Sequence, residues 1–301
     1  MSNFLYSNHH YFVGAALLAT SSVAAYSTYK LMTQTRSKPE QDNLYETAKV
    51  INQYLVFHYG APEEVLRYDF GPKESLDFPR RVAEECLNAV RATDKSSIPN
   101  RALDIGCAVG RTTFELAREF EQVVGIDYSQ AFVDTCNLLR EKRILDYSVV
   151  DEGDLQTSLT ATIDPTIDRS RTHFQRGDAC SLPLDLGQFG CVVAANLLCR
   201  LHSPSQFLDR LPSLVAPGGI LVLTTPCTWL AEYTPKDKWT GGFTNTEGEK
   251  VTTFDTLKQV LGPDFDLVDE KGMSFFIRET ARKNQWTVAQ LTIWKRKGGA
   301  S

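Results

Sequence analysis

The sequence lacks the features that would place it in several large classes of protein. Its 301 residues carry a formal net charge of −5, and no basic block is long enough to follow a phosphate backbone, which makes nucleic acid a poor candidate for its substrate. The seven cysteines are odd in number and include no C-x-x-C pair, which disfavours a disulfide framework and a zinc site. The five histidines also lack metal-ligand spacing. These absences predict a reducing compartment and no bound metal.

Charged side chains are missing from the first 29 residues. Within this stretch, residues 11–29 are moderately apolar and long enough to cross a bilayer as a helix, which needs about 20 residues. Basic residues first appear on the C-terminal flank, at Lys30, Arg36 and Lys38. By the positive-inside rule, residues 1–38 are predicted to anchor the protein in a membrane with its catalytic part facing the cytosol. Two alternatives stay open: a cleaved targeting peptide, giving an organelle-targeted or soluble cytoplasmic protein, and an apolar disordered leader.

A composition change after the leader predicts two further parts. Residues 44–98 form a cap, because apolar residues recur there at helical spacing over 44–58 and again over 78–90. The rest of the fold, residues 99–296, alternates short apolar runs with helical patterns, which is typical of a parallel α/β sheet.

The centre of this core is a strand followed by a glycine turn. Residues 103–105 are an apolar strand, and Gly106 and Gly110 allow the chain to turn tightly and approach a ligand closely. A helix follows, and then a second apolar run ends in Asp127. This layout is typical of a nucleotide site in which the acid accepts hydrogen bonds from a ribose.

The spacing of this turn indicates which nucleotide is bound. Asp104, Gly106 and Gly110 lack the third glycine of the dinucleotide fingerprint, and an acid before the turn suits a ligand with a cationic end and no pyrophosphate. S-adenosylmethionine has these properties, and the pattern resembles the first motif of class I methyltransferases. The predicted cofactor-binding residues are Asp104, Gly106, Cys107, Gly110, Asp127, Asp178, Ala179 and Asn196.

Two later strand ends complete the predicted donor site. Asp178 follows the strand predicted at 172–175 and would meet the adenine amino group, although a plain turn aspartate remains an alternative. Asn196 and Arg200 follow the continuous apolar run 190–195 and should face the transferred methyl group, because ligands lie outside the carboxyl ends of parallel strands. A buried structural role for Asn196 stays open.

The remaining segments predict a complete sheet. Residues 145–171 read as an irregular insertion with a short strand at 147–150. Further strands are expected at 220–225, 265–271 and 287–295, with a charged crossing segment at 275–283. The predicted fold is therefore α/β: a Rossmann-like class I methyltransferase fold with a seven-stranded, mostly parallel sheet and a helical N-terminal cap, preceded by the apolar leader or transmembrane helix.

Several segments resemble one particular family. They are residues 54–60, 103–111, 177–180, 196–201, 225–230 and 277–283. In this order they are similar to the C-terminal mercaptohistidine N-methyltransferase domain of the ovothiol-biosynthesis enzyme, from about Tyr45 to Lys295. Members of that family commonly carry an iron-dependent sulfoxide synthase ahead of this domain, where the present chain has the apolar leader. The resemblance thus implies only the methyl-transfer step, on a small amino-acid substrate supplied by a separate sulfoxide synthase.

The resemblance also implies roles for individual residues. It assigns catalysis to Asn196, Arg200, Tyr54 and His58, and substrate binding to Tyr59, Trp229, Arg278, Glu279 and Arg282. An arginine would bind the substrate carboxylate, Glu279 its ammonium group, and the aromatic residues its ring. A solvated helix face at 278–283 and core positions for the cap aromatics are the open alternatives. Two other functions also stay open: a membrane-tethered methyltransferase for a lipid or quinone, and a protein that binds S-adenosylmethionine without turnover.

Overall fold

The computed structural model describes residues 44–94, 96 and 98–298. The predicted anchor at residues 1–38, with its span at 11–29, lies outside the described residues. Within the part of the chain that is described, no helix is both long and apolar enough to cross a bilayer. From Tyr45 onward the described residues form one compact unit.

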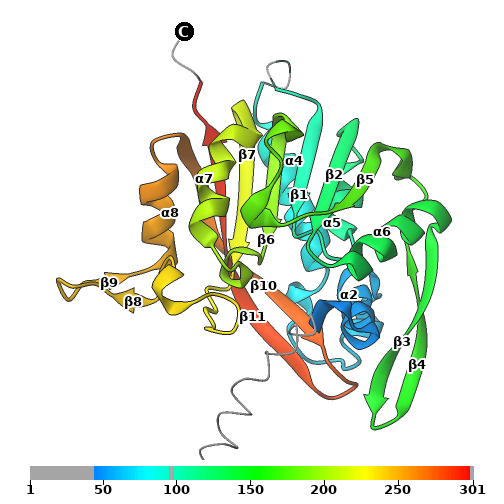
Figure 1. Ribbon diagram of the computed structural model, residues 1–301. Coiled ribbons are helices and arrows are strands. Elements are labelled where there is room, and N and C mark those ends of the chain that lie inside the picture. The colour runs from blue at the N-terminus through cyan, green and yellow to red at the C-terminus, as the bar shows by residue number, and fades with distance from the viewer. Residues whose placement is uncertain (1–43, 95, 97, 299–301) are drawn as a thin grey trace, which may run out of the picture. The chain divides into compact units, whose positions relative to one another are not determined.

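Seven strands form the central sheet, in the order β10-β11-β7-β6-β1-β2-β5 (Figure 1). Their bounds are β1 Arg101–Ile105, β2 Gln122–Asp127, β5 Thr172–Arg176, β6 Phe189–Ala195, β7 Val215–Thr225, β10 Phe265–Arg278 and β11 Asn284–Arg296. β5, β2, β1, β6 and β7 pair in parallel, and β11 is antiparallel to both of its neighbours. The predicted Rossmann-like class I methyltransferase sheet is therefore confirmed.

Helices cover both faces of this sheet because its central strands are apolar on both sides. α4 (Phe78–Arg91), α5 (Arg111–Leu116) and α6 (Gln130–Lys142) pack against one face. α7 (Pro204–Leu214) and α8 (Thr253–Leu261) pack against the other. In β6, every residue from Phe189 to Ala194 is buried, which is the pattern expected of a strand between two helical layers.

The cap lies at the carboxyl ends of the parallel strands. It contains η1 (Leu44–Glu46), α2 (Ala48–Tyr59), α3 (Pro62–Val65) and η2 (Lys73–Ser75). The Thr47 side chain accepts a hydrogen bond from the backbone N–H of Val50 and so begins α2. α2 contacts β10 as well as a second hairpin, β3 (Ile144–Glu152) and β4 (Leu155–Thr162). Contacts on two sides fix this helix over the sheet edge.

Two predicted segments were wrong. Residues 144–162 form the β3–β4 hairpin, not an irregular insertion, and β10 continues to Arg278, so the crossing segment at 275–283 does not exist. Gln290 of β11 pairs with Thr225, the last residue of β7, so the β10–β11 hairpin extends past the sheet edge (Figure 1). The sequence did not predict the β3–β4 hairpin or the full length of β10, because these segments pack on the cap rather than between helices.

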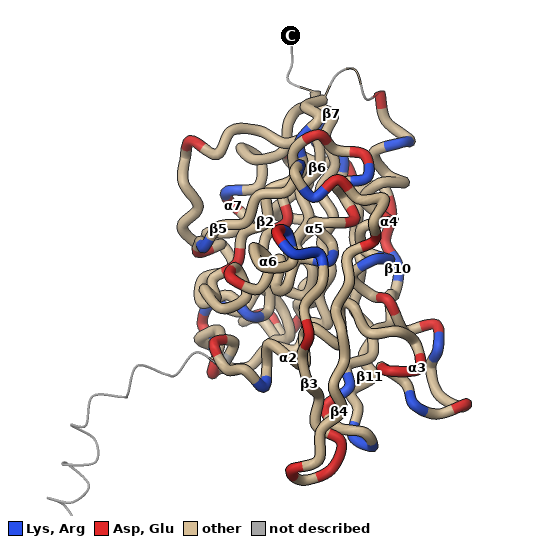
Figure 2. Tube along the Cα trace, turned by 90° about the vertical axis from the view of Figure 1, so that its right-hand side faces the viewer, with Lys and Arg blue, Asp and Glu red and all other residues tan. Residues whose placement is uncertain are grey.

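The remaining regular elements are short. They are η4 (Arg169–Arg171), η5 (Ala179–Ser181), η6 (Leu184–Leu186), η7 (Leu198–Arg200), η8 (Lys236–Lys238) and the two-residue strands β8 (Phe243–Thr244) and β9 (Lys250–Val251). Figure 2 shows acidic and basic residues interspersed along the chain.

Candidate functional site

Asp127 stands at the carboxyl end of β2, next to the glycine turn. The backbone N–H of Ala108 donates to its Oδ2 and that of Ser129 to its Oδ1, both at 2.9 Å. Burial raises the pKa of this carboxyl to about 6 in spite of these bonds. A carboxylate offers about four acceptor positions, so Asp127 can accept further donors, and its contact with a ribose stays a prediction.

Asp104 lies beneath the turn. Its side chain is buried, and Thr113 Oγ1 donates to its Oδ2 at 2.7 Å. Burial raises the pKa of Asp104 to about 7, with the neighbouring charge of Asp127 adding to the effect. The structure therefore gives Asp104 a local partner that the sequence pattern did not reveal.

The glycine turn is shaped by left-handed backbone. Gly106 and Gly110 have φ values of +76° and +85°, which side chains with a Cβ rarely adopt. A Cβ on Gly110 would also lie 2.9 Å from Cys136 Sγ. Cys107, predicted to contact the donor, is buried, and its backbone N–H donates to the Ile126 carbonyl at 3.1 Å.

Asn196 follows β6 in a left-handed conformation, with φ +54°. Its backbone N–H donates to the carbonyl of Thr224 at 2.8 Å, and Thr224 Oγ1 donates to its side-chain oxygen at 2.9 Å. These bonds tie both the backbone and the side chain of Asn196 to β7.

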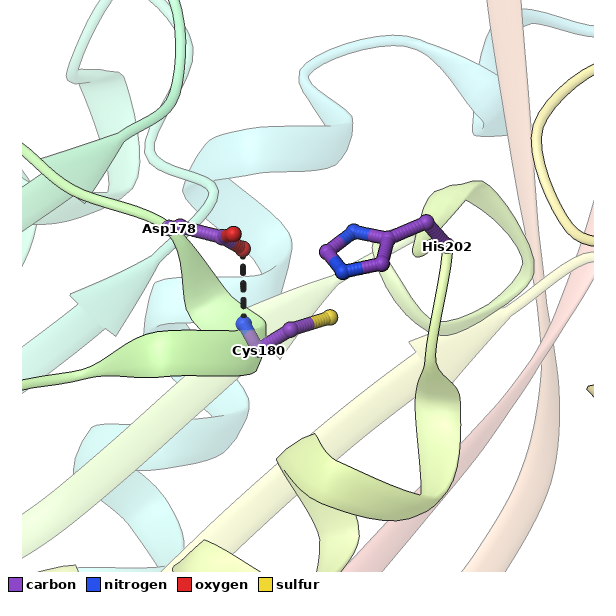
Figure 3. Close-up of side chains that lie close together, drawn as sticks. All are labelled: Asp178, Cys180 and His202. Atoms are coloured by element: carbon purple, nitrogen blue, oxygen red, sulfur yellow. Dashed lines mark hydrogen bonds between the residues drawn. The ribbon is translucent and has the colours of Figure 1, made fainter.

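Asp178 and Ala179 follow β5 on the same edge. Asp178 Oδ1 accepts a hydrogen bond from the Cys180 backbone N–H at 2.8 Å and so begins η5. Ala179 is buried. Figure 3 shows that His202, from the loop before α7, lies beside Asp178 and Cys180. Sequence reasoning missed this neighbour because 22 positions separate it from Cys180.

Two predicted ring-binding residues of α2 have other partners. Tyr59 Oη donates to the Val109 carbonyl at 2.8 Å, so it holds the glycine turn from behind. His58 is buried, and its Nδ1 accepts the backbone N–H of Arg111 at 3.4 Å. Burial, with the Arg111 charge, lowers the pKa of His58 to about 3. His58 is therefore neutral at physiological pH and positions the cap on α5.

Tyr54 and Arg200 belong to an aromatic and cationic cluster. The Arg200 guanidinium lies 4.9 Å from the ring centroid of Tyr233 and donates to the Thr228 carbonyl at 2.9 Å. The ring centroids of Tyr45 and Tyr54 are 6.1 Å apart. Burial raises the pKa of Tyr54, and the nearby charges of Asp127 and Arg200 shift it further, in opposite directions. We call Tyr45, Tyr54, Tyr233 and Arg200 the tyrosine–arginine cluster. Tyr45 and Tyr233 were missed because no local pattern marks them.

Trp229 turns away from this cluster. Its Nε1–H donates to Thr253 Oγ1 at 2.9 Å, and its ring stacks on Trp239 with centroids 6.3 Å apart. It lines a cavity of about 650 Å³ together with Cys227 and Phe254. Its role in contacting a substrate ring stays a prediction.

Arg278, Glu279 and Arg282 lie at the tip of the β10–β11 hairpin. Arg278 is 3% exposed, pairs with Asp151 at 2.5 Å and donates to the Glu64 carbonyl at 2.6 Å. Glu279 pairs with Lys283 at 2.6 Å, and Arg282 is exposed. Both Nη atoms of Arg278 thus have partners within the fold, whereas its buried Nε has none. Its role as the substrate-carboxylate ligand stays a prediction.

Comparisons with known proteins show which proteins the chain resembles. Residues 103–223 match a family described as "Methyltransferase domain". The chain is 25% identical over 166 residues to "Probable tocopherol O-methyltransferase, chloroplastic" of Oryza sativa subsp. japonica, covering 53% of this chain and 40% of that protein. It is 27% identical over 125 residues to "Ubiquinone biosynthesis O-methyltransferase" of Psychrobacter cryohalolentis, covering 42% and 40%. The chain thus spans less than half the length of these relatives.

Solved structures with a similar fold include the N-methyltransferase NodS from Bradyrhizobium japonicum WM9 in complex with S-adenosyl-L-homocysteine. The identity is 17% and the TM-score 0.44, covering 82% of this chain and 98% of that one. The profile match and the strand order of the sheet lead to one conclusion: residues 103–223 resemble a methyltransferase domain.

Proposed function

We propose that this protein transfers a methyl group from S-adenosylmethionine to an imidazole nitrogen of a mercaptohistidine (thiohistidine), giving ovothiol. The observation that carries the proposal is the tyrosine–arginine cluster, in which the rings of Tyr45 and Tyr54 lie 6.1 Å apart and Arg200 lies over the ring of Tyr233. The sequence segments that resemble the mercaptohistidine N-methyltransferase domain include two members of this cluster, Tyr54 and Arg200.

Arg200 has the chemistry to hold the carboxylate of an amino acid. Its Nη1 donates to Thr228 and to Cys199, and its Nη2 donates to Thr228 Oγ1 at 3.1 Å. A guanidinium carries five N–H donors, so the edge formed by Nε and Nη2 keeps two for a carboxylate, in the bidentate geometry that arginine favours. These bonds and the contact with the Tyr233 ring also fix the plane of the guanidinium.

The tyrosines suit a small aromatic ring that must be oriented without a strong base. Burial raises the pKa of Tyr54 to about 12, so its hydroxyl stays protonated and acts as a hydrogen-bond donor or acceptor. An ordinary imidazole has a pKa of roughly 6.5, which leaves a nitrogen lone pair free at neutral pH. Catalysis then rests on alignment, which contributes about 7–11 kcal/mol in favourable cases.

The proposed step is an in-line displacement. The imidazole lone pair forms the N–CH3 bond while the S–CH3 bond breaks, and the sulfur keeps the bonding electrons and leaves as S-adenosylhomocysteine. The methylated ring then loses its other N–H proton to solvent. Since the sulfur of a thiohistidine competes as a nucleophile, Arg200 and the tyrosine hydroxyls must hold the ring with its nitrogen toward the donor.

The test uses the full-length protein, methyl-labelled S-adenosylmethionine, and mercaptohistidine or histidine as acceptor. We expect label on a ring nitrogen of mercaptohistidine, identified by mass spectrometry. Arg200→Lys should raise the acceptor KM at least tenfold and leave the donor Kd within twofold, because Lys lacks the planar two-pronged edge. Arg80→Lys, an exposed arginine of α4, is the matched control. Label on sulfur, or an Arg200→Lys variant with wild-type KM, would contradict the proposal.

A second candidate is methylation of a phenolic hydroxyl on a membrane lipid or quinol. The two relatives named above, which are both O-methyltransferases, favour it, as does the proposed anchoring of residues 1–38 in a membrane. Label in a demethylated quinol or tocopherol precursor presented in vesicles, with none in mercaptohistidine, would select this candidate. Donor binding without label in any of these acceptors would instead select a binding protein.

A further inference from the structure

Three side chains with metal-ligating atoms meet at the edge of the donor site. Each of Asp178, Cys180 and His202 offers one ligand atom, and these atoms all lie within 4.8 Å of one another (Figure 3). Asp178 and Cys180 belong to the turn that follows β5, and His202 to the loop between η7 and α7. The convergence is tertiary, which explains why the spacing of histidines and cysteines gave no signal.

Local hydrogen bonds fix the positions of two of these side chains. The backbone N–H of Cys180 donates to Asp178 Oδ1 at 2.8 Å, and Cys180 Sγ donates to the Ser203 carbonyl at 3.3 Å. The thiol therefore points at the loop that carries His202. That histidine is exposed, so its ring is free to rotate toward the other two groups.

The ligand set selects a class of ion. One thiolate, one imidazole and one carboxylate are typical ligands of zinc and similar transition-metal ions, and unsuitable for magnesium or calcium, which take oxygen. With metal–ligand bonds of about 2.0–2.3 Å, tetrahedral ligand atoms are roughly 3.5 Å apart. The present separations thus need to close by roughly 1 Å, which rotation of His202 can supply, and water would fill the fourth position.

We propose that Asp178, Cys180 and His202 bind one divalent ion of the zinc class, and that this ion and the methyl donor exclude each other. The second half rests on the donor assignment, in which Asp178 meets the adenine amino group. A carboxylate oxygen bound to a cation no longer accepts that hydrogen bond, and the ion with its water occupies the space beside η5. The bound metal is therefore an inhibitor of donor binding.

Cobalt is the probe for the first half, because a cobalt–thiolate bond absorbs in the near ultraviolet and needs no enzyme activity to be seen. Cys180 and Cys227 are the two cysteines that are not fully buried. We expect one cobalt per full-length chain with a thiolate band that Cys180→Ser abolishes. His202→Ala should weaken binding at least tenfold. Cys227→Ser and His173→Ala, which alter an exposed cysteine and an exposed histidine outside the cluster, are the controls.

A band that survives in Cys180→Ser, a band lost in Cys227→Ser, or no band at millimolar cobalt would overturn the metal site. Circular dichroism and thermal unfolding of Cys180→Ser check that it is folded, and Asp178→Asn gives an independent second variant. None of these readouts depends on the acceptor or on methyl transfer.

Calorimetry with S-adenosylhomocysteine tests the second half. Zinc should raise the apparent Kd of the wild-type protein at least tenfold and leave that of Cys180→Ser within twofold. Unchanged affinity in a protein that shows the cobalt band would overturn the mutual exclusion. Failure of the proposed methyl transfer to mercaptohistidine would leave both measurements intact, so the two proposals can fail separately.

Discussion

Replacing Asp127 by Asn probes the donor site with the smallest change in shape. The carboxylate accepts the backbone N–H groups of Ala108 and Ser129, one on each oxygen, and the proposed donor site gives its remaining acceptor capacity to the ribose. An amide keeps only one oxygen. One backbone N–H therefore faces an NH2 group, and one ribose hydroxyl loses its acceptor.

The magnitude follows from these two losses. A hydrogen bond to a charged group contributes about 1.5–3 kcal/mol, so the donor Kd should rise about 10–150-fold. The unsatisfied N–H costs the fold about 1–3 kcal/mol. Because burial holds the pKa of Asp127 near 6, protonation removes the same acceptors as pH falls. At pH 5 about one Asp127 carboxyl group in eleven is ionised, so the Kd of the wild-type protein for the donor should be about tenfold higher than at pH 8.

Calorimetry with S-adenosylhomocysteine at pH 5 and pH 8 measures both effects, and urea unfolding gives the cost to the fold. Asp134→Asn, an exposed acid of α6, is the control and should bind like the wild type. Comparing pH dependence with Asp127→Asn isolates the share of Asp127, since the amide does not titrate. A folded variant with a Kd within twofold of the wild type would refute a ribose contact at this position.

Three further predictions concern buried groups. Asp104→Asn, which retains an acceptor for Thr113 Oγ1, should unfold at a higher temperature than the wild type at pH 8. Burial raises the pKa of Asp104 to about 7, so ionisation of this carboxyl group destabilises the fold as pH rises. A lower unfolding midpoint for the variant would contradict this. Arg278→Met should reduce the free energy of unfolding by about 1–3 kcal/mol, since the Glu64 carbonyl loses its donor and Asp151 keeps only Arg67 as an arginine partner, while the acceptor KM stays unchanged; a raised KM at full stability would restore Arg278 to the substrate site. His58→Gln should flatten the dependence of stability on pH: with the pKa of His58 lowered to about 3, the wild type loses about 2 kcal/mol between pH 7 and pH 5, which urea unfolding at the two pH values would show.

The sheet could be predicted because a local sequence pattern marks each of its parallel strands. Runs such as residues 190–195 are apolar on both faces and end at glycine, acid or amide residues, so their order and the donor turn follow from the sequence. The cap-side hairpins could not be predicted. In β3 only Tyr147 and Val149 are buried, too few for a clear period of two.

The acceptor side was harder to predict because its contacts join distant positions. The sequence does not show that Arg278 forms an ion pair with Asp151, 127 positions away. The sequence suggests that Trp229 contacts the ring of the substrate, but it does not show that the indole N–H donates to Thr253 of α8. Tyr45 and Tyr233 come to the same cluster from opposite ends of the chain. Such partners are fixed by tertiary packing, which no single stretch of sequence encodes.

The contacts of α2 with the glycine turn limit which segments of this protein can be exchanged with those of a relative in a chimera. Tyr59 binds the Val109 carbonyl, and His58 binds the backbone of Arg111, so the cap holds the shape of the turn that receives the donor. Residues 103–223 therefore cannot be moved into another protein without α2. A chimera designed to change acceptor specificity must keep α2 together with its own glycine turn and exchange the loop after β7, where Tyr233 lies. A chimera that separates α2 from this turn will lose donor affinity before its specificity can change.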